Sequence, residues 1–325
     1  MIVRALIFLV VAATLLAIGA PTARAQSYPV KPIRLLVGFP PGGQSDTAAR
    51  MIGARLTDRL GQSIVIENRA GAGGTIAAEA MARSNADGYT LLLGSPSNIT
   101  LAPLLYPDLR YDPLRDLIAI GRFARVPMVI AANAKMPFAD LRQLVSYARA
   151  HPGALTCATS ALSGQLAVQL LMNAAAIEIV HVPYKGSAAA VADVIAGHAN
   201  FTLADFSALA AHGKAGTLRL LAVTGPKRLR EAPDLPTTAE QGFDDALAYS
   251  WQAIMVPRGT PADVVATLRR ALADVTGTAA FREALERTGF EPNEGDPTDV
   301  ADLLREETDR YRTLVKQAGL RVDPP

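Results

Sequence analysis

The alternation of short apolar segments with helix-like segments constrains the fold of this 325-residue chain more than any other feature. Residues 33–39 form a nearly continuous apolar run, which is typical of a buried strand. Proline and glycine end this run at 40–43, and a helix pattern follows in which Ala48, Ile52 and Leu56 recur every four residues. Further strands are expected at 64–66, 89–93, 126–132, 155–158, 177–182, 200–203, 218–223 and 251–256, with helices between most of them, including one at 165–175. This alternation predicts an α/β fold with mostly parallel sheets.

Two stretches interrupt the alternation. Residues 110–125 are basic and irregular, and residues 226–248 are polar and punctuated by proline. A chain of this length allows two domains of ~150 residues each. We therefore expect two sheets rather than one.

The first 25 residues have the three parts of a secretory signal peptide. Arg4 supplies the positive charge, residues 6–20 are almost entirely apolar, and an A-x-A cleavage site ends at Ala25. The apolar run is shorter than the roughly 20 residues that span a bilayer, which disfavours a transmembrane anchor. We expect a mature chain that begins at Gln26 and is soluble and exported to the periplasm.

Composition excludes several classes of protein. The chain is 50% hydrophobic and 19% charged, which excludes a disordered chain. Once the two arginines of the leader are set aside, acidic and basic side chains are equal in number, so we expect no nucleic-acid partner. The single cysteine, Cys157, lies in an apolar strand and predicts a buried, inert thiol. A large core can replace disulfides in an exported chain of this size.

The sequence offers no catalytic or cofactor-binding motif. The four histidines are not spaced as metal ligands, and neither a phosphate-binding lysine loop nor a G-x-S-x-G elbow occurs. Residues 71–74 follow a strand as a dinucleotide loop would, but Ile76 occupies the third glycine position. His181 ends an apolar strand and is expected to pack in the interior. We therefore expect no metal and no cofactor.

Four junctions between a strand and the following helix carry glycine or small polar residues. They lie at 42–45, 94–98, 159–164 and 184–187. Ligands of open α/β sheets bind outside the carboxyl ends of the strands, against helix N-termini. Free backbone N–H groups and the positive end of the helix dipole make each junction either an anion site or an ordinary turn with a helix cap. Taken together, the four junctions predict a shared cleft between the two sheets.

A series of short motifs runs along nearly the whole mature chain. They are Y-P-V-K-P-I-R at 28–34, G-F-P-P-G-G at 38–43 with Asp46, E-N-R at 67–69, G-A-G at 71–73, H-V-P-Y-K-G-S at 181–187, L-A-V-T at 221–224, L-P-T at 235–237, E-Q-G at 240–242 and P-R-G-T-P at 257–261. In these motifs and in their order, the chain resembles the Bug family of periplasmic solute-binding proteins. These proteins are the receptors of the tripartite tricarboxylate transporter system.

The resemblance implies a two-lobed fold of the periplasmic-binding-protein type (type II, flytrap-like), with two mostly parallel sheets. Lobe one would comprise residues 27–125 and 246–325, and lobe two residues 126–245. The family also implies no catalysis. It implies a small organic anion bound between the lobes, which is a dicarboxylate, a tricarboxylate, an acidic amino acid or an aromatic acid. The partners would be the membrane permease subunits of a tripartite tricarboxylate transporter, and we expect the receptor itself to be a monomer.

The resemblance further implies which residues bind the ligand. The first loop would supply Pro40, Gly42, Gly43, Gln44, Ser45 and Asp46, and the later junctions Ser95, Ser97, Asn98, Thr159, Ser160, Tyr184, Lys185, Gly186, Ser187 and Asp205. The chain departs from the family at 159–164, where the loop is shorter than in relatives, and Gln165 stands where relatives carry histidine. This departure predicts a reshaped pocket wall.

Two other functions stay open at the level of sequence. A sensory receptor of the same fold would deliver its ligand to a signalling partner instead of a permease. A secreted hydrolase would need a nucleophile and a base, for which the chain shows no motif. Neighbouring genes would distinguish the first alternative, and an ester-cleavage screen the second.

The A-x-A site predicts cleavage after Ala25. Intact-mass measurement of the protein recovered from a periplasmic extract is expected to give a chain that begins at Gln26. Recovery of a chain that retains the segment from Met1 would contradict this prediction.

Overall fold

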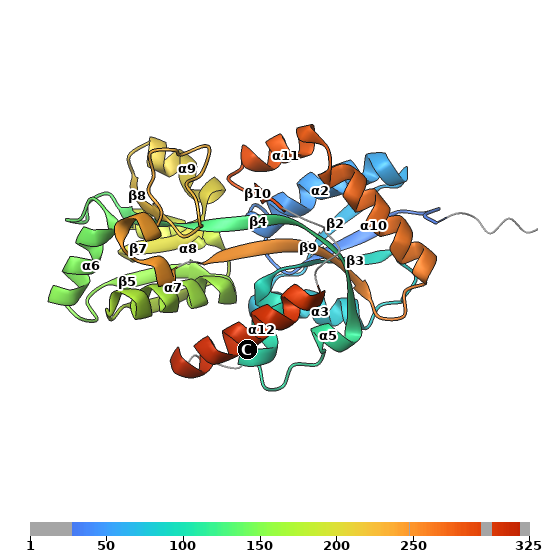
Figure 1. Cartoon of the computed structure of the whole chain (residues 1–325), viewed down its shortest axis with the longest axis horizontal. Coiled ribbons are helices and arrows are strands. Elements are labelled where there is room, and N and C mark those ends of the chain that lie inside the picture. Colours follow the sequence, from blue (N-terminus) through green and yellow to red (C-terminus); the bar gives the residue numbers. More distant parts are fainter. Residues whose placement is uncertain (1–27, 247, 294–300, 319–325) are drawn as a thin grey trace, which may run out of the picture.

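The computed structural model describes residues 28–246, 248–293 and 301–318. The predicted signal peptide and its cleavage site lie outside the described residues. Strands and helices alternate along the chain, and the molecule consists of two parts joined by long strands (Figure 1). The predicted α/β fold is confirmed. No helix of the described chain is long and apolar enough to cross a membrane.

The strands of the two parts form one continuous sheet with the order β2-β1-β3-β9-β4-β7-β5-β6, and β8 and β10 also pair with β4. Their bounds are β1 Ile33–Val37, β2 Ile64–Asn68, β3 Thr90–Gly94, β4 Leu117–Asn133, β5 Thr156–Ser160, β6 Val180–Tyr184, β7 Phe201–Asp205, β8 Leu218–Val223, β9 Tyr249–Pro257 and β10 Glu291–Pro292. Strands β1, β2 and β3 are parallel, as are β5, β6 and β7. The two central strands, β4 and β9, run antiparallel to their neighbours. Each end of the sheet is therefore a parallel α/β unit, as expected, but β9 and β4 join the two units into one sheet where two separate sheets were expected.

Strand β4 belongs to both parts of the molecule. Its residues 117–127 pair with β9, and its residues 128–133 pair with β7 and β8. The expectation that 110–125 is irregular was wrong from Leu117 onward. The register of β4 against β9 shifts on either side of Gly121 and Arg122, and these shifts break the two-residue period by which a strand is recognised in sequence.

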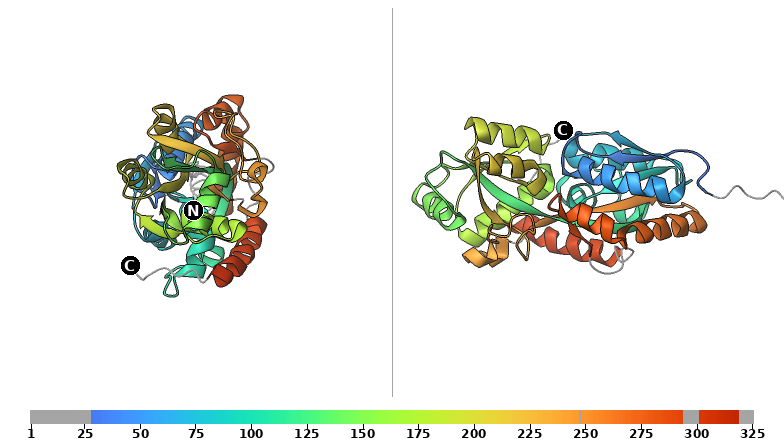
Figure 2. Two further views of the ribbon diagram at one scale, coloured as in Figure 1. Left: turned by 90° about the vertical axis from the view of Figure 1, so that its left-hand side faces the viewer. Right: turned by 90° about the horizontal axis from the view of Figure 1, so that it is seen from above.

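Helices cover the faces of the sheet in both parts, as the view from above also shows (Figure 2). Their bounds are α2 Gln44–Leu60, α3 Thr75–Ala82, α4 Ala102–Leu105, α5 Pro113–Asp116, α6 Leu141–Ala150, α7 Ala161–Ala175, α8 Ser187–Ala196, α9 Phe206–Lys214, α10 Ala262–Thr276, α11 Ala279–Glu286 and α12 Ala301–Ala318, with the single-turn helices η1 Ala72–Gly74, η2 Ser97–Leu101, η3 Ala239–Gln241 and η4 Asp244–Ala246. The helix expected from 165 begins four residues earlier, at Ala161. The predicted loop at 159–164 is therefore the end of β5 and the first turn of α7.

Three hydrophobic clusters hold the layers together. One packs β1, β3, β9 and part of β4 against α2, α3 and α10, and it contains the fully buried Trp251. The other two lie in the part built on β5 and β7, and one of them contains Cys157. The prediction of a buried thiol is confirmed, because Cys157 is fully buried and burial raises the pKa of its thiol. Leu101 and Leu105 pack in the same cluster as Leu162 and Leu166 of α7, so this cluster also joins the two parts.

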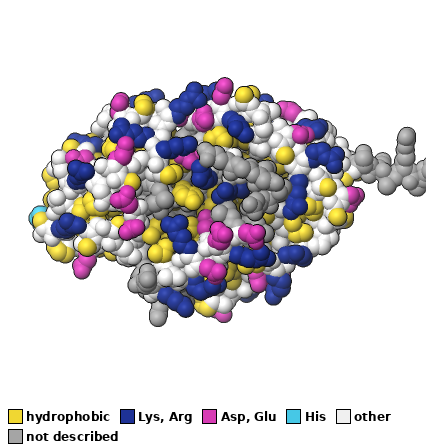
Figure 3. Space-filling model, in the orientation of Figure 1, with side chains coloured by type: hydrophobic (Ala, Val, Ile, Leu, Met, Phe, Trp, Pro, Cys, Tyr) yellow, Lys and Arg dark blue, Asp and Glu magenta, His cyan; other side chains and the backbone are white. Residues whose placement is uncertain are grey.

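Charged side chains of both signs are interspersed on the molecular surface (Figure 3). Many form exposed ion pairs, such as Arg59 with Asp274 and Arg228 with Glu240. Pairs of this kind contribute little to stability, typically about 0–1 kcal/mol each. The fold therefore depends on the buried clusters and on the strands that pass between the two parts.

The hydroxyl of Thr224 contacts the chain segments that cross from one part to the other. Thr224 is almost fully buried just beyond the end of β8. Its Oγ1 accepts a hydrogen bond from the amide of Met128 at 3.0 Å. It also lies 3.0 Å from the carbonyl oxygen of Met128 and 2.5 Å from that of Ala248. The three segments around β4, β8 and β9 therefore share one side-chain contact.

Replacement of Thr224 by valine is expected to lower the free energy of unfolding by about 1–3 kcal/mol, because it keeps the shape but leaves buried backbone groups without their partner. Chemical denaturation measures the effect. The matched control is Thr276→Val, since the hydroxyl of Thr276 donates a single exposed hydrogen bond to Ala273. Equal stability of the two variants would show that the Thr224 hydroxyl is not needed at the crossing.

Candidate ligand-binding site

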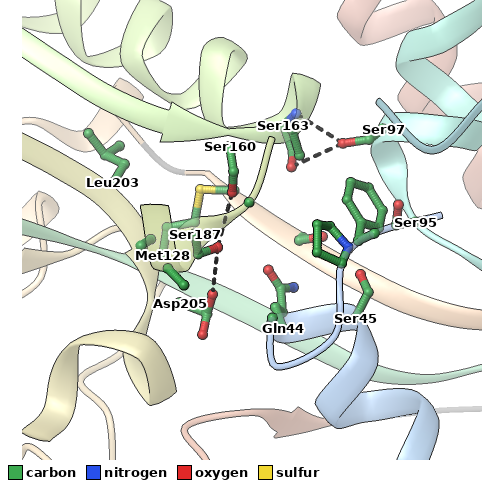
Figure 4. Close-up of a pocket in the computed structure, with 18 of the residues that line it drawn as sticks. Gln44, Ser45, Ser95, Ser97, Met128, Ser160, Ser163, Ser187, Leu203 and Asp205 are labelled. Atoms are coloured by element: carbon green, nitrogen blue, oxygen red, sulfur yellow. Dashed lines mark hydrogen bonds between the residues drawn. The ribbon is translucent and has the colours of Figure 1, made fainter. Parts of the chain in front are cut away.

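A cavity opens between the two parts of the molecule, at the carboxyl ends of the parallel strands. Its space is about 660 Å³, open solvent included. Its lining residues come from both sides of the crossing strands: Phe39, Pro40, Pro41, Gly43, Gln44, Ser45, Ser95, Ser97, Met128, Ser160, Ala161, Ser163, Gly186, Ser187, Ala188, Leu203, Ala204, Asp205 and Ser250. Figure 4 shows several of these side chains pointing toward one another across the space.

Three long helices begin at the wall of this cavity without a side-chain cap. Helices α2, α7 and α8 follow the N-cap residues Gly43, Ser160 and Gly186, and none of these caps its helix with a side-chain hydrogen bond. In contrast, α6 and α11, which begin away from the cavity, are capped by the side chains of Asp140 and Thr278. Apart from the Ser163 amide, which donates to the Ser97 hydroxyl, the N–H groups of the first turns of α2, α7 and α8 are therefore available to a ligand, and the helix dipoles favour a negative one.

Uncharged polar side chains supplement these backbone donors. Seven of the lining residues are serines. The side-chain nitrogen of Gln44 is buried and has no hydrogen-bond partner, and the amide of Gln44 points into the space (Figure 4). A buried amide nitrogen without a partner costs free energy, which a bound ligand or water would recover. Within the part of the chain that the structure describes, no lysine or arginine lines the cavity.

The first loop is fixed from behind by Asp46. Its carboxylate is almost fully buried and accepts hydrogen bonds from the amide of Gly42 at 2.9 Å, from Arg50 at 2.8 and 3.0 Å, and from Asn68 at 3.0 Å. Burial alone would raise the pKa of Asp46, but the hydrogen bonds from Arg50, Gly42 and Asn68 outweigh it and lower the pKa. Asp46 and Gly42 do not line the cavity; they hold the loop that does.

The two glycines of this loop have different roles. Gly42 has φ +80°, which a residue with a side chain rarely adopts. Gly43 has φ −84°, and a Cβ added there would have only the carbonyl oxygen of Pro40 within 4 Å, at 3.6 Å. The glycine requirement of the turn is thus at Gly42. Gly43, which the resemblance implied as a ligand contact, lines the cavity and has room for a side chain.

The junction at 94–98 also combines a lining residue with a supporting one. Asn98 is fully buried, and its Oδ1 accepts hydrogen bonds from the amide and the hydroxyl of Ser95. Ser97 reaches across the cavity to Ser163, with 3.3 Å between the hydroxyl oxygens and 3.2 Å from the Ser163 amide to the Ser97 hydroxyl (Figure 4). Asn98 therefore positions Ser95, while Ser97 and Ser163 link the two parts directly.

Three of the predicted residues line a neighbouring cavity instead. Thr159, Tyr184 and Lys185 lie around a space of about 1060 Å³, open solvent included, which shares Pro40 and Ala161 with the first cavity. The hydroxyl of Thr159 is 2.7 Å from Nε2 of His181, and burial lowers the pKa of this histidine. His181 is only partly buried, so the expectation of an interior histidine holds in part.

Most of the predicted site residues therefore meet at one cavity, namely Pro40, Gly43, Gln44, Ser45, Ser95, Ser97, Ser160, Gly186, Ser187 and Asp205. Sequence reasoning missed Ser163 and Ser250 among the polar lining residues. Ser163 lay inside the junction at 159–164, but it was not among the residues that the resemblance implied as ligand contacts. Ser250 lies on β9 two residues before Gln252, and no pattern marked it. Within the described chain, no group of three His, Cys, Asp or Glu residues could bind a metal ion.

Comparison with known proteins agrees with this architecture. Residues 48–320 match the tripartite tricarboxylate transporter family receptor. Protein BugT of Bordetella pertussis is 36% identical over 312 residues, which cover 94% of each chain. A solved R. palustris protein with adipate is 36% identical with a TM-score of 0.87 over 91% of this chain and 99% of that one. The periplasmic binding protein BugD is 29% identical with a TM-score of 0.83 over 90% and 99%.

The sheet order, the two parts and the cavity between them define a two-lobed solute-binding fold of the periplasmic-binding-protein type. The chain belongs to the tripartite tricarboxylate transporter receptor family, and the Bug-family resemblance is confirmed.

The variant Asp46→Asn is expected to lower the free energy of unfolding at neutral pH by about 1–3 kcal/mol, because it removes charge-assisted hydrogen bonds to the first loop. Since the fold lowers the pKa of Asp46, the carboxylate stabilises the protein fully above its ordinary value of 3.8, and this contribution is lost as the pH falls through the lowered value. Denaturation of both proteins between about pH 7 and pH 3 measures the difference.

Asp58→Asn is the matched control, because Asp58 lies on the same helix and is exposed, 4.0 Å from Arg55. We expect its effect to stay below about 1 kcal/mol. If the difference in the free energy of unfolding between wild type and Asp46→Asn does not become smaller as the pH falls, the charge of Asp46 is not what stabilises the loop.

Proposed function

We propose that this protein binds a small carboxylate in the cavity between its two parts and delivers it to the permease subunits of a tripartite tricarboxylate transporter. The observation that carries the proposal is the convergence of three uncapped helix N-termini, those of α2, α7 and α8, on one cavity. Family membership and the binding of adipate by one similar protein support a carboxylic acid as the ligand.

Backbone donors can bind such an anion without a basic side chain. Each helix N-terminus carries the equivalent of about half a positive charge. Enclosure between the two parts removes water, which strengthens the hydrogen bonds from N–H and hydroxyl groups. The hydroxyl of Ser45 adds a donor whose direction adjusts to the ligand.

We further propose the lobe boundaries given above, with residues 27–125 and 246–325 in one lobe and 126–245 in the other. Both boundaries fall close to the segments joined at Thr224. A ligand that touches both lobes favours the closed arrangement by its differential affinity for it. The contact between Ser97 and Ser163 is then one of the bonds that closure makes.

Export completes the proposed pathway. The leader that ends at Ala25 would direct the chain to the periplasm, the compartment named for the similar protein BugD. There the receptor would meet its ligand before the membrane permease does. No catalytic step enters this function.

The variant Gly43→Val tests the location of the site. Gly43 lines the cavity, its backbone suits any residue, and an added Cβ meets no protein atom closer than 3.6 Å. The variant is therefore expected to stay folded and to lose at least tenfold in affinity, about 1.4 kcal/mol. A thermal-shift screen over carboxylic acids first identifies a ligand, which at about 100 times its Kd stabilises the wild type by about 2.7 kcal/mol. Calorimetric titration of both proteins then measures the loss.

Circular dichroism and the melting temperature of the free variant are the controls for folding. If no carboxylic acid stabilises the wild type, the proposed function is wrong. If an acid binds the well-folded variant as tightly as the wild type, the ligand lies elsewhere.

A further inference from the structure

One side chain sets the cavity apart from a site built for anions alone. Among the described residues that line it, Asp205 is the only one with an acidic or basic side chain. Asp205 is 3% exposed, at the end of β7. A second carboxylate placed beside it would be repelled in a poorly hydrated space. The part of the ligand that lies beside Asp205 must therefore be a group other than a carboxylate.

The two carboxylate oxygens of Asp205 have different surroundings. Oδ2 caps helix α9, because it accepts hydrogen bonds from the amide of Ala208 at 3.1 Å and from the hydroxyl of Ser207 at 2.5 Å. Oδ1 accepts one long hydrogen bond, 3.4 Å from the hydroxyl of Ser187. Since a carboxylate oxygen accepts about two hydrogen bonds, Oδ1 retains acceptor capacity toward the cavity.

A chain of hydroxyls extends this acceptor character. Ser187 donates to Asp205, and Ser160 lies 3.0 Å from Ser187 (Figure 4). Because the single proton of Ser187 is engaged by Asp205, Ser187 accepts from Ser160 in the same arrangement. The protons of both serines are then used within the chain, and their remaining lone pairs are left for a ligand. The side chains on this side of the cavity present acceptors, beside the backbone N–H groups at the starts of α7 and α8.

The other side of the cavity presents donors. Ser45 and the first turn of α2 offer a hydroxyl and free N–H groups, and the side-chain nitrogen of Gln44 has no partner. In Figure 4, Ser45 and Ser95 lie on one side of the space and Ser187 and Asp205 on the other, with Gln44 between them. The side chains of the site are therefore polarised, with donors for an anion at one end and acceptors at the other.

We propose that Asp205, together with Ser187, selects ligands that carry a hydrogen-bond donor, an ammonium or a hydroxyl group, in addition to the carboxylate. The inference rests on the proposed function, since it assumes that a carboxylate occupies the donor side. It assigns the Asp205 carboxylate a second role besides capping α9. An amino acid or a hydroxy acid fits this arrangement, and the corresponding unsubstituted acid leaves Oδ1 with only its long hydrogen bond from Ser187.

Matched series of acids test the selection. Succinate, malate and aspartate differ in one substituent at one carbon, and glutarate, 2-hydroxyglutarate and glutamate repeat the comparison with a longer chain. We expect at least one substituted acid of a series to bind the wild type tenfold or more tightly than its unsubstituted parent, measured by calorimetric titration at neutral pH. Equal or tighter binding of the parent acid in both series overturns the selection but leaves the proposed function intact. Binding of no acid in either series, nor in the wider screen, overturns both.

The variant Asp205→Asn separates selection from capping. Asparagine also caps helices, so α9 keeps its bond to the amide of Ala208, while the atom facing the cavity becomes a donor or a neutral acceptor. We expect the variant to stay folded and its preference for the substituted acid to fall below threefold. The control is Asp140→Asn, the same change at the N-cap of α6, where Asp140 accepts from the amide of Gln143 away from the cavity.

The control variant Asp140→Asn is expected to prefer the substituted acid as strongly as the wild type does. A preference retained by Asp205→Asn contradicts the proposal, because a merely structural role would leave the ratio of affinities unchanged. If Asp205→Asn does not fold, Ser187→Ala gives the same test, since it removes the hydroxyl that joins Asp205 to Ser160. The preference of Ser187→Ala for the substituted acid is expected to fall. An unchanged ratio of its affinities for the substituted and the parent acid overturns the proposal.

Discussion

The structure depends on a sheet that continues through both parts of the molecule by way of β4. This 17-residue strand pairs with β9 in one part and with β7 and β8 in the other. Hydrogen bonds along a strand fix the relative register of everything attached to it. The parallel strands of each part consequently end at the same cavity, and the hydroxyl of Thr224 joins the segments that pass between the parts.

A second constraint follows at the helix ends. A helix N-terminus leaves several N–H groups without an internal partner, and proteins usually satisfy them with a side-chain cap. Helices α2, α7 and α8 lack that cap where they meet the cavity, and α9 beside them is capped by Asp205. The uncapped N-termini of α2, α7 and α8 favour a bound anion. The carboxylate of Asp205, at the N-terminus of α9, disfavours an anion beside it. The cavity is thereby both attractive to a carboxylate and directional.

Sequence patterns predicted most elements but failed where pairing departs from regular geometry. The start of β4 was predicted as irregular, because register shifts near Gly121 disturb its alternation. The beginning of α7 was placed at 165 instead of Ala161, which has φ +65°. A non-glycine residue in the left-handed region directly before a helix has no signature in composition or periodicity. Ser163, which was not among the predicted site residues, lies in the first turn of α7, and its hydroxyl contacts Ser97 across the cavity.

The sequence by itself determined the α/β class, the buried state of Cys157, the family, and most of the residues that line the cavity. These follow from local periodicity, hydrophobicity and ordered motifs, which are properties of short stretches of chain. Tertiary structure decided which junction residues face the space and which support it. Gly42, Asp46 and Asn98 do not line the cavity but support residues that do. Asp205 and Ser187 line it. The reason is physical: the direction of a side chain at a junction is set by contacts with distant segments, such as Asn68 with Asp46, and no local pattern encodes them.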